Sequence, residues 1–366
     1  MISIIGAGPV GSYCAYILAK KGFKVHLFEE HPKTGIPVQC TGIVTKNIFK
    51  YVPKSKEFVI NHFSEVQAVA PDNSFAQIPL NEYLLDRTRF DNFLLNQAVN
   101  AGAQVHFNHK FIGLKGKKAV FRTKEGFVGC NSEHIIGADG PLSKVAKSAG
   151  LYNNREFLIG MQAVVRGNFS QHTFTTFFGN NTSPGFFAWV VPESSTTARV
   201  GLATKKNTTY YFQNLLNELH FQPIEYQGGL IPIYNSHNLS QQVQNNDNDV
   251  HLIGDAACLV KSTTGGGLIP GLESARILAK CIPNNQTNNY SNAIKKLRFQ
   301  LYLHNLIRNT LDNFSDADYN NLIKQMKKSA VQNILAKADR DFPVNMLVKL
   351  VLVNPGFISF IKNINP

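Results

Sequence analysis

The sequence is poor in features that mark several protein classes. Its 366 residues include five cysteines, one tryptophan and 24 acidic residues against 37 lysines and arginines. The cysteines are odd in number, widely spaced and form no Cys-x-x-Cys pair: Cys14, Cys40, Cys130, Cys258 and Cys281. This pattern argues against a disulfide framework and a zinc module, and it favours a reducing, cytoplasmic setting. The eleven histidines show no H-E-x-x-H or clustered ligand spacing, so no metal site is predicted.

Long apolar runs are also missing. No stretch of about 18 apolar residues occurs, and the nearest approach, residues 344–364, is interrupted by lysines and a Pro-Gly pair. We therefore expect no membrane-spanning helix. The N-terminus begins directly with the strand-like segment MISIIG, so we also expect no signal peptide.

What remains is an ordinary apolar content with a strong basic excess. The hydrophobic fraction is 43%, charged residues make up only 17%, and the formal net charge is +13. This composition excludes wholesale disorder, and the length favours two or three lobes. The basic excess suggests a polyanionic partner, for which nucleic acid, an anionic membrane and a phosphorylated small molecule all qualify.

The beginning of the chain has the pattern of a parallel sheet. Apolar segments at residues 2–5 and 23–28 flank a glycine turn and a helix-like segment at 13–21. Such a strand–helix–strand order is typical of a βαβ unit. A helix at 89–101 and a strand at 103–107 are expected to follow.

The middle and the end of the chain differ from this beginning. Residues 157–203 contain short β-rich segments separated by turn residues, which favours an antiparallel sheet. Residues 235–249 are rich in Asn and Gln and are predicted to be a surface connection, and a strand resumes at 250–253. From residue 291 onward the pattern is helical and basic.

The first turn carries a dinucleotide-binding fingerprint. Gly-Ala-Gly-Pro-Val-Gly follows a strand, opens a helix and precedes a second strand that ends in two glutamates. The glycines let a pyrophosphate approach the helix N-terminus, and the acid accepts hydrogen bonds from ribose hydroxyls. The predicted adenine dinucleotide site comprises Gly6, Gly8, Pro9, Val10, Gly11, Glu29 and Glu30.

Two later strands also end in an acid and glycines. The segment 134–143 runs into Asp139 and Gly140, and the segment 250–257 runs into Gly254 and Asp255. Ligands of open α/β sheets bind at such carboxyl ends of strands. A run of three glycines and a leucine follows the second segment, at Gly265, Gly266, Gly267 and Leu268. The glycines let the backbone approach a flat ring and phosphates.

Together these three elements resemble the flavoprotein hydroxylase and reductase superfamily, which binds FAD through them in this order. Within it the chain is similar to the geranylgeranyl reductase family, over residues 1–280. The similarity lies in a flavin-side G-x-P-x-x-C-x-G segment with Cys40, Thr41 and Gly42, in the helix-opening Arg87, in the loop after Asp255, and in a cavity signature with Phe187, Trp189 and Pro192. The chain departs from the family's Y-x-W-x-F-P form of that signature, with Phe187 in place of the tyrosine and Val191 in place of the phenylalanine, and Lys261-Ser262 stands where many members carry proline.

The resemblance implies a fold and a cofactor. We expect an α/β FAD-binding Rossmann-like domain, an inserted antiparallel β-sheet substrate domain (α+β) and a C-terminal helical region. The expected FAD domain comprises residues 1–50, 85–150 and 245–285. The expected substrate domain comprises 51–84 and 151–240, and the helical region 286–366.

The resemblance also implies an activity, the hydrogenation of isoprenoid C=C bonds of geranylgeranyl chains. The substrate would be an archaeal-type digeranylgeranyl phospholipid or a free prenyl diphosphate. The electron donor stays open between NAD(P)H, ferredoxin and another reductant, because no second dinucleotide motif occurs. Cys40 is the predicted catalytic residue, and three interpretations stay open for it: a reactive thiol beside the flavin, a proton donor or a packing residue. Trp189 is either a cavity wall or a core residue.

Two other functions share part of this evidence. An FAD monooxygenase acting on an aromatic or prenyl substrate would carry the same three dinucleotide elements. A nucleic-acid-binding protein would explain the charge, but no compact basic-aromatic motif supports it, and we expect no nucleic acid partner. The basic, apolar tail fits either a peripheral contact with the anionic inner face of the cell membrane or a helical cap on the sheet. The oligomeric state is not predicted.

Overall fold

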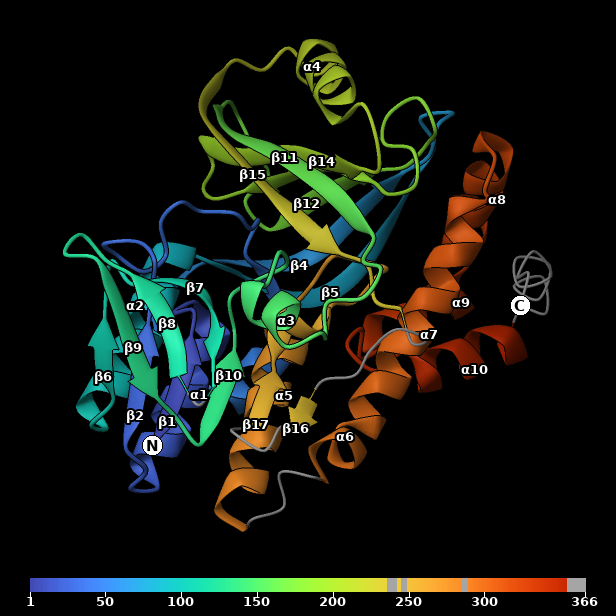
Figure 1. The fold of residues 1–366 in the computed structure, drawn as a ribbon. Helices are drawn as coiled ribbons and strands as arrows, with labels where there is room; N and C mark the ends of the chain where they lie inside the picture. Colours follow the sequence, from blue (N-terminus) through green and yellow to red (C-terminus); the bar gives the residue numbers. More distant parts are fainter. Residues whose placement is uncertain (117, 236–241, 245–248, 285–288, 354–366) are drawn as a thin grey trace. The chain divides into compact units, whose positions relative to one another are not determined.

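The structure is a computed structural model that describes residues 1–116, 118–235, 242–244, 249–284 and 289–353 (Figure 1). Most of the predicted Asn- and Gln-rich connection and the last apolar residues of the tail, including Phe357 and Phe360, lie outside these ranges. The chain forms two compact units. The first contains residues 1–37, 87–156 and 232–302, and the second contains 38–86, 157–231 and 303–366. The division into an FAD-binding and a substrate-binding domain stays a prediction, because these two units are defined by compactness and not by the ligands they bind.

The first unit is built on a six-stranded sheet. Five strands pair in parallel, and β16 pairs antiparallel with β17 at one edge. Their order is β16 (Gln242–Gln244), β17 (Asp249–Leu252), β10 (His134–Gly137), β1 (Ile2–Ile5), β2 (Val25–Phe28) and β6 (Gln104–His106). The central strand β1 is buried along its whole length, as expected for a strand covered on both faces.

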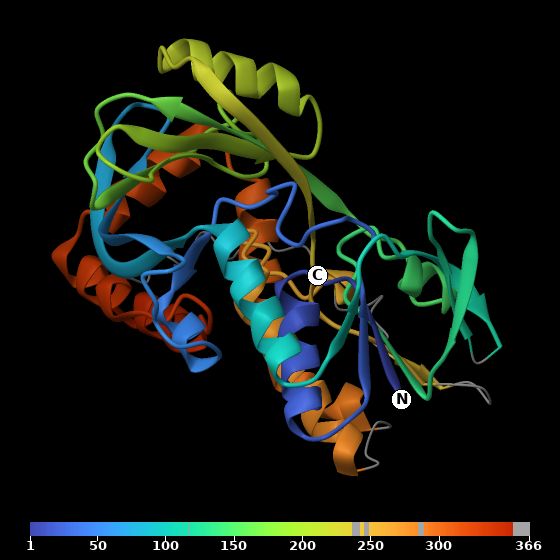
Figure 2. The ribbon, with the colours of Figure 1, turned by 90° about the vertical axis from the view of Figure 1, so that its left-hand side faces the viewer.

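Three helices pack together in this unit. Helix α1 (Pro9–Lys20) contacts α2 (Arg87–Asn100) and α5 (Leu268–Cys281), and Figure 2 shows α1 and α2 side by side. Helix α1 begins at Pro9, four residues before the predicted start, because the fixed φ of proline suits the first helical position. Its buried residues include Tyr13, Cys14 and Leu18.

A smaller sheet in the first unit was not predicted. It is antiparallel, in the order β7 (Lys110–Lys115), β8 (Lys118–Arg122) and β9 (Phe127–Asn131). Its strands carry lysines, arginine and glycine, so the alternation of apolar residues is weak. The sheet is held by Phe111 and Phe121, whose rings lie 5.8 Å apart in an edge arrangement, and by α3 (Lys144–Ser148) against β7.

The second unit contains an eight-stranded sheet. Its order is β15 (Pro223–Pro232), β11 (Phe157–Arg166), β14 (Thr197–Thr204), β13 (Ala188–Pro192), β12 (Thr173–Phe177), β4 (Val59–Val69), β5 (Phe75–Leu85) and β3 (Ile43–Thr45). The predicted antiparallel pairing holds for β11, β14, β13 and β12. The prediction needs one correction: β12 and β4 pair in parallel, so the sheet is mixed.

Helices cover parts of this sheet. Helix α4 (Thr208–Glu218) packs on β11 and β14, with Phe212 and Leu215 against Val200 and Leu202. Helices α8 (Asp316–Met326) and α9 (Ser329–Lys337) contact β5, where Ile323 packs with Ala68 and Ala76. Short α6 (Tyr290–Ala293), long α7 (Lys295–Asp312) and α10 (Val344–Val353) complete the helical end of the chain. Among the residues that the structure describes, no helix is long and apolar enough to cross a membrane.

The predicted fold class is thereby confirmed. A Rossmann-like parallel sheet, a separate β-sheet unit and a C-terminal helical region are all present. The carboxyl ends of β1, β2, β10 and β17 meet at one edge of the parallel sheet, which is where such sheets bind ligands.

Candidate flavin site and aromatic cluster

The three glycines in the turn after β1 have different surroundings. Gly6 has a φ of +101°, and a Cβ atom there would lie 2.4 Å from the Ala138 carbonyl oxygen. A Cβ atom on Gly11 would lie 2.0 Å from the Gly6 oxygen. A Cβ atom on Gly8 would meet nothing within 4 Å. Gly6 and Gly11 are therefore required for packing, whereas the space over Gly8 lies open to an approaching group.

The N-terminus of α1 supplies the positive end of this turn. Pro9 is the first helical residue and the first helical turn contains no acidic residue. The first N–H groups of a helix have no intrahelical acceptor, so they point at an anion placed before them. Val10 packs against the segment that follows β17 and against α5. Cβ atoms on Gly254 and Gly271 would lie 3.2 Å and 2.6 Å from its methyl groups.

The two glutamates after β2 have different surroundings. Glu29 Oε2 accepts a hydrogen bond from the Ala7 N–H at 2.9 Å, which places this carboxylate beside the glycine turn. Its other oxygen accepts from the His31 N–H at 3.0 Å. Glu30 instead bonds Lys110, and this hydrogen bond lowers the pKa of the Glu30 carboxyl. Glu29 is thus the glutamate that lies at the turn.

Asp139 follows β10, and its carboxylate accepts hydrogen bonds from residues of the following turn. The Ser143 hydroxyl donates to Oδ1 at 2.5 Å and the Val145 N–H donates to Oδ2 at 3.0 Å, so the carboxylate caps the first turn of α3. Burial raises the pKa of Asp139, and these hydrogen bonds oppose the rise. Gly140 has a φ of +75° with open space at its Cβ position. Contact of Asp139 and Gly140 with FAD stays a prediction.

Asp255 follows β17 in the short 3₁₀ helix η3 (Gly254–Ala257). Burial raises the pKa of its carboxyl to about 6, and the Arg87 guanidinium opposes the rise. Gly267 packs directly on this carboxylate, since a Cβ there would lie 2.6 Å from Asp255 Oδ1. In the predicted glycine run, Gly265 has a φ of +67°, Gly266 bridges to Lys261, and Leu268 begins α5.

Arg87 stands at the first position of α2. Its Nε and Nη2 donate to the two carboxylate oxygens of Asp91 at 3.1 Å and 3.0 Å, a bidentate pair on one helical face. The next residue, Thr88, donates its hydroxyl hydrogen to the Gly35 carbonyl at 3.2 Å. The fold therefore places the Arg87 segment within electrostatic range of Asp255, although the two are far apart in sequence.

The remaining predicted cofactor residues, Cys40, Thr41 and Gly42, belong to the second unit. Cys40 is a free, half-buried thiol. The Thr41 hydroxyl donates to Gln162 Oε1 at 2.7 Å, and the same oxygen accepts from the Trp189 indole N–H at 3.3 Å. Gln162 thus joins the cysteine segment to the tryptophan of the cavity signature.

Arg199 fixes the same segment from β14. It donates to the Thr41 carbonyl oxygen and also pairs with Glu193 at 2.7 Å. Gly42 has a φ of +89°, and a Cβ there would lie 2.6 Å from the Leu85 carbonyl oxygen and 3.1 Å from Arg199 Nη1. A side chain at position 42 would displace this arrangement.

Aromatic rings continue from Trp189, which is 8% exposed. Phe187 lies edge-on to Trp189 with ring centroids 6.0 Å apart, and it stacks on Phe186 at 4.3 Å. Phe178 contacts Phe187 at 5.8 Å and Tyr319 of α8 at 5.7 Å. We call Phe178, Phe186, Phe187, Trp189 and Tyr319 the aromatic cluster. Pro192, the last signature residue, ends β13, and its carbonyl oxygen accepts from the Asn61 amide at 2.9 Å.

Sequence reasoning missed Gln162 and Arg199. Both are buried, at 4% and 6% exposure, within strands whose neighbouring residues are largely apolar. A polar or charged side chain inside an apolar strand is a signal, because burial of such a group requires partners. The partners themselves depend on strand pairing and could not be read from the sequence.

Comparison with sequence families supports the predicted cofactor. A family described as NAD(P)-binding Rossmann-like domain matches residues 4–53, and one described as FAD binding domain matches residues 55–285. The second match covers more than half of the chain. It confirms the FAD cofactor predicted from the sequence. The N–H groups at the start of α1 and the open space over Gly8 fit that cofactor.

Curated relatives confirm the predicted resemblance to geranylgeranyl reductases. Digeranylgeranylglycerophospholipid reductase 2 of Methanothermobacter thermautotrophicus is 28% identical over 75% of this chain and 76% of its own length. Reductase 3 of Methanosphaera stadtmanae is 25% identical over 92% of this chain and 93% of its own length. The reductase of Methanocaldococcus jannaschii is 25% identical over 99% and 97%.

Solved structures share the fold. A geranylgeranyl bacteriochlorophyll reductase-like protein of Thermoplasma acidophilum superposes with a TM-score of 0.83, 21% identity, and coverage of 99% of this chain and 98% of the other. The p-nitrophenol 4-monooxygenase PnpA of Pseudomonas putida has a TM-score of 0.63 at 16% identity, covering 98% of both chains. The fold is thus common to reductases and oxygenases, and by its sequence this chain belongs to the FAD binding domain family.

Proposed function

We propose that this chain is an FAD-dependent reductase that hydrogenates isoprenoid C=C bonds of geranylgeranyl chains. The observation that carries the proposal is the link through Gln162 between the Cys40–Gly42 segment and Trp189 of the aromatic cluster. This link joins the two signatures of the geranylgeranyl reductase family within one unit. The names of the archaeal relatives support the same activity.

The first unit would bind the cofactor, and FAD when bound supplies hydride transfer to the double bond. The open space over Gly8 and the N-terminus of α1 would receive the pyrophosphate, and Glu29 would orient a ribose. Asp255 and Arg87 would hold the flavin side of the cofactor. We retain the predicted division, in which residues 1–50, 85–150 and 245–285 bind FAD.

The second unit would bind and align the prenyl chain. An isolated alkene is a poor hydride acceptor, so a dry site that fixes the double bond must supply much of the rate. The aromatic cluster offers such apolar surface, and Gln162 and Arg199 fix the backbone of the Cys40–Gly42 segment. A small cavity of about 60 Å³ lined partly by Phe177, Phe178 and Leu219 lies beside the cluster. It is smaller than the ~300–1,000 Å³ of typical ligand pockets, so this cavity alone would not hold a long prenyl chain.

Cys40 is the residue that we propose to hold the proton for the second carbon. Its thiol is free and half-buried, at the start of the segment that Gln162 and Arg199 fix. A tyrosine or an ordered water would serve the same role. The Cys40→Ala and Cys40→Ser variants separate these cases: loss of turnover with unchanged flavin binding assigns the proton to Cys40, and retained turnover assigns it elsewhere.

The test of the function is anaerobic. The purified protein should be yellow, and after incubation with dithionite and a digeranylgeranyl lipid each reduced bond should add two hydrogen masses to the lipid. A free geranylgeranyl diphosphate in a parallel reaction distinguishes lipid from diphosphate substrates. A colourless protein that cannot bind FAD, or a bound flavin with unchanged lipid, would refute the proposal.

A monooxygenase is the second candidate, because oxygenases share the fold. It would consume oxygen in step with product formation under NAD(P)H and would add one oxygen mass to the product. Turnover without oxygen excludes it. The same assays, run with NAD(P)H, reduced ferredoxin and dithionite, identify the electron donor.

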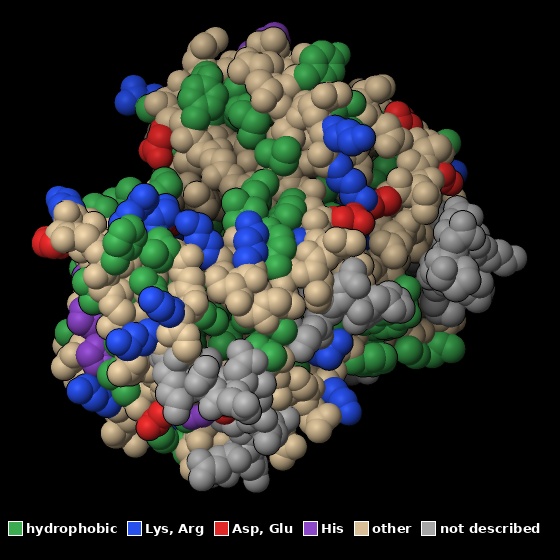
Figure 3. Space-filling model, in the orientation of Figure 1, with side chains coloured by type: hydrophobic (Ala, Val, Ile, Leu, Met, Phe, Trp, Pro, Cys, Tyr) green, Lys and Arg blue, Asp and Glu red, His purple; other side chains and the backbone are tan. Residues whose placement is uncertain are grey.

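We further propose that the chain meets its lipid at an anionic membrane surface of the cytoplasmic face. Lys and Arg predominate over Asp and Glu on the face drawn in Figure 3. Helix α10 exposes Val348, Leu352 and Val353 next to Lys349. Apolar and basic groups together are what an anionic interface attracts. Not all tail residues are available, since Arg308 is 2% exposed and pairs with Asp312.

A further inference from the structure

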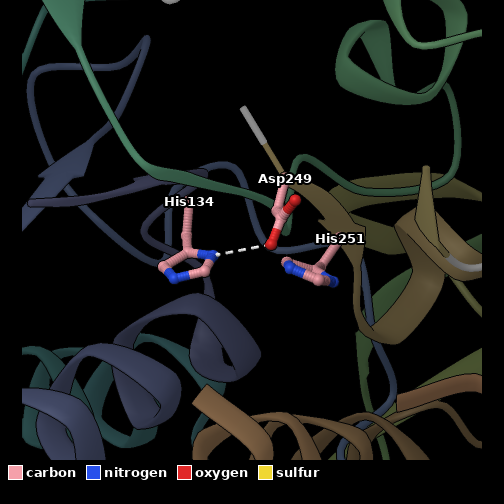
Figure 4. Close-up of side chains that lie close together, drawn as sticks. All are labelled: His134, Asp249 and His251. Atoms are coloured by element: carbon pink, nitrogen blue, oxygen red, sulfur yellow. Dashed lines mark ion pairs between the residues drawn. The ribbon is translucent and has the colours of Figure 1, made fainter. Parts of the chain in front are cut away.

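Three potential metal ligands meet at the amino ends of two paired strands in the first unit. His134 is the first residue of β10 and Asp249 the first residue of β17, and the parallel register pairs them directly. His251 lies two residues further along β17, so its side chain leaves the same face as that of Asp249. Figure 4 shows the three side chains converging.

Their distances suit a metal ion. His134 Nδ1 lies 3.6 Å from Asp249 Oδ2, which is beyond hydrogen-bond distance. One ligand atom from each residue lies within 4.8 Å of the others, and small side-chain rotations would bring them to the spacing around one ion. The side chains of His134 and Asp249 are each 20% exposed, whereas His251 is 0% exposed, so solvent reaches the first two residues and not the third.

Three of the four ring nitrogens of these histidines have no hydrogen-bond partner among the described residues. Within the described part of the chain, neither His251 Nδ1 nor Nε2 forms a hydrogen bond, and the contact of His134 Nδ1 with Asp249 at 3.6 Å is an ion-pair contact and not a hydrogen bond. A neutral imidazole carries one N–H and one lone pair, and buried groups of this kind are almost always satisfied. The His251 ring lies edge-on to that of Tyr290 at 6.0 Å and 5.8 Å from that of His134. Ring nitrogens without hydrogen bonds beside a carboxylate are free to coordinate a cation.

We infer that His134, Asp249 and His251 bind one divalent transition metal of the zinc type. Two imidazoles and one carboxylate are ligands that Zn²⁺ accepts, and a water would complete a tetrahedral set. Calcium and magnesium are disfavoured, because they require oxygen ligands.

The electrostatics of the site support this assignment. A carboxylate oxygen of Asp249 lies within 4.8 Å of one ring nitrogen of each of the two histidines. The Asp249 carboxylate supplies a negative charge.

The site is separate from the candidate flavin site. Its ligands lie at the amino ends of β10 and β17, whereas Asp139 and Asp255 follow the carboxyl ends of the same two strands. Four strand residues place these ends ~10 Å apart. A metal here would tie β10 to β17 and stabilise the sheet. The sequence predicted no metal site, because His134 and His251 are brought together only by the pairing of these strands.

Zinc binding to tag-free, chelator-treated full chain tests the inference. We expect one Zn²⁺ per chain by isothermal titration, tetrahedral Co²⁺ absorption on substitution, and a higher unfolding temperature with metal. Asp249→Asn, His134→Gln and His251→Gln should each weaken zinc binding at least about 100-fold. His172→Gln, an exposed histidine of the second unit, is the matched control and should change nothing.

Several results would overturn the inference. The first is the absence of stoichiometric zinc binding at micromolar concentration. The second is zinc binding by the three site variants that equals that of the parent. The third is zinc binding that does not raise the unfolding temperature. If His251→Gln fails to fold, the more exposed His134 and Asp249 still decide the question. FAD titration should give the same affinity with and without zinc, and this readout is independent of the proposed reductase activity.

Discussion

At the residue scale, the three glycines of the first motif have different tasks. A methyl group on Gly11 would collide with the Gly6 oxygen at 2.0 Å, whereas a methyl group on Gly8 would enter open space. Gly11→Ala should therefore destabilise the apoprotein by about 1–3 kcal/mol, the usual range for overpacking. Gly8→Ala should leave apoprotein stability unchanged and weaken FAD binding, because the methyl group occupies the space that the pyrophosphate requires. Urea unfolding and flavin titration of both variants separate the two tasks.

The two variants serve as controls for each other. Equal loss of stability in both would mean that the space over Gly8 is filled by the chain. Unchanged FAD affinity in Gly8→Ala would remove this turn from the cofactor site.

A second residue-scale prediction concerns pH. The pKa of Asp255 is about 6 in the folded chain against an ordinary value of 3.8. Between these values the folded state binds more protons than the unfolded state, so this carboxyl makes stability fall as pH rises from about 3.8 to 6 and leaves it constant above. Asp255→Asn removes the effect, and its apoprotein should be more stable than the parent by about 1–3 kcal/mol above pH 6. Unfolding curves between pH 4 and 8 measure this difference.

The control for this experiment is an exposed carboxyl whose pKa is shifted in the opposite direction. Hydrogen bonds from Ser74 lower the pKa of Asp72. Asp72→Asn should keep the Asp255-dependent fall between pH 4 and 6. A parent protein whose stability rises over this window, or an Asp255→Asn variant that keeps the fall, would contradict the assignment.

At the element scale, Gln162 couples β11 to β13 and to the cysteine segment. Gln162→Leu would leave the Trp189 N–H and the Thr41 hydroxyl without their acceptor, which should cost about 1–3 kcal/mol of stability. Trp189 is the only tryptophan, so its fluorescence reports on this site alone. We expect a blue-shifted emission maximum and a lower urea midpoint.

Gln227→Leu is the matched control. Gln227 accepts from the Gln162 amide nitrogen at 2.6 Å, so its loss leaves both bonds to Gln162 Oε1 in place. Its emission spectrum should equal that of the parent. Equal spectral shifts in the two variants would show that the emission follows general packing and not the Trp189 hydrogen bond.

The elements also show what a sequence can and cannot predict. Strands with clear apolar patterns, such as β1 and β17, were predicted within a residue of their observed bounds, and the spacing of Gly6, Gly8 and Gly11 predicted their turn. The β7–β9 sheet and helix α4 were missed, since their apolar residues are few or irregularly spaced. The parallel pairing of β12 with β4, the Gln162 link and the His134–Asp249–His251 cluster depend on strand register, which no local pattern encodes.

At the scale of the whole molecule, the basic excess exceeds what the cofactor requires. The net charge is +13, whereas a pyrophosphate at a helix N-terminus needs few positive groups. Because α10 exposes apolar residues, we assign part of this charge to attraction toward an anionic lipid surface. Electrostatic attraction of this kind is worth about 1 kcal/mol per basic residue near the surface and is screened by salt.

The chain should therefore bind vesicles rich in phosphatidylglycerol, bind phosphatidylcholine vesicles weakly, and dissociate as NaCl rises from about 0.1 to 0.5 M. Leu352 is 75% exposed, and its burial in the interface should contribute about 1.5–3 kcal/mol. Leu352→Asp should then lower vesicle partitioning at least about tenfold in co-sedimentation, since 1.4 kcal/mol corresponds to a factor of ten. Phe127→Asp, at a residue 74% exposed on β9, is the control and should bind like the parent. Equal binding to neutral and anionic vesicles, or an equal loss in both variants, would exclude α10 as the contact, because either result requires attraction that is independent of this helix and of charge.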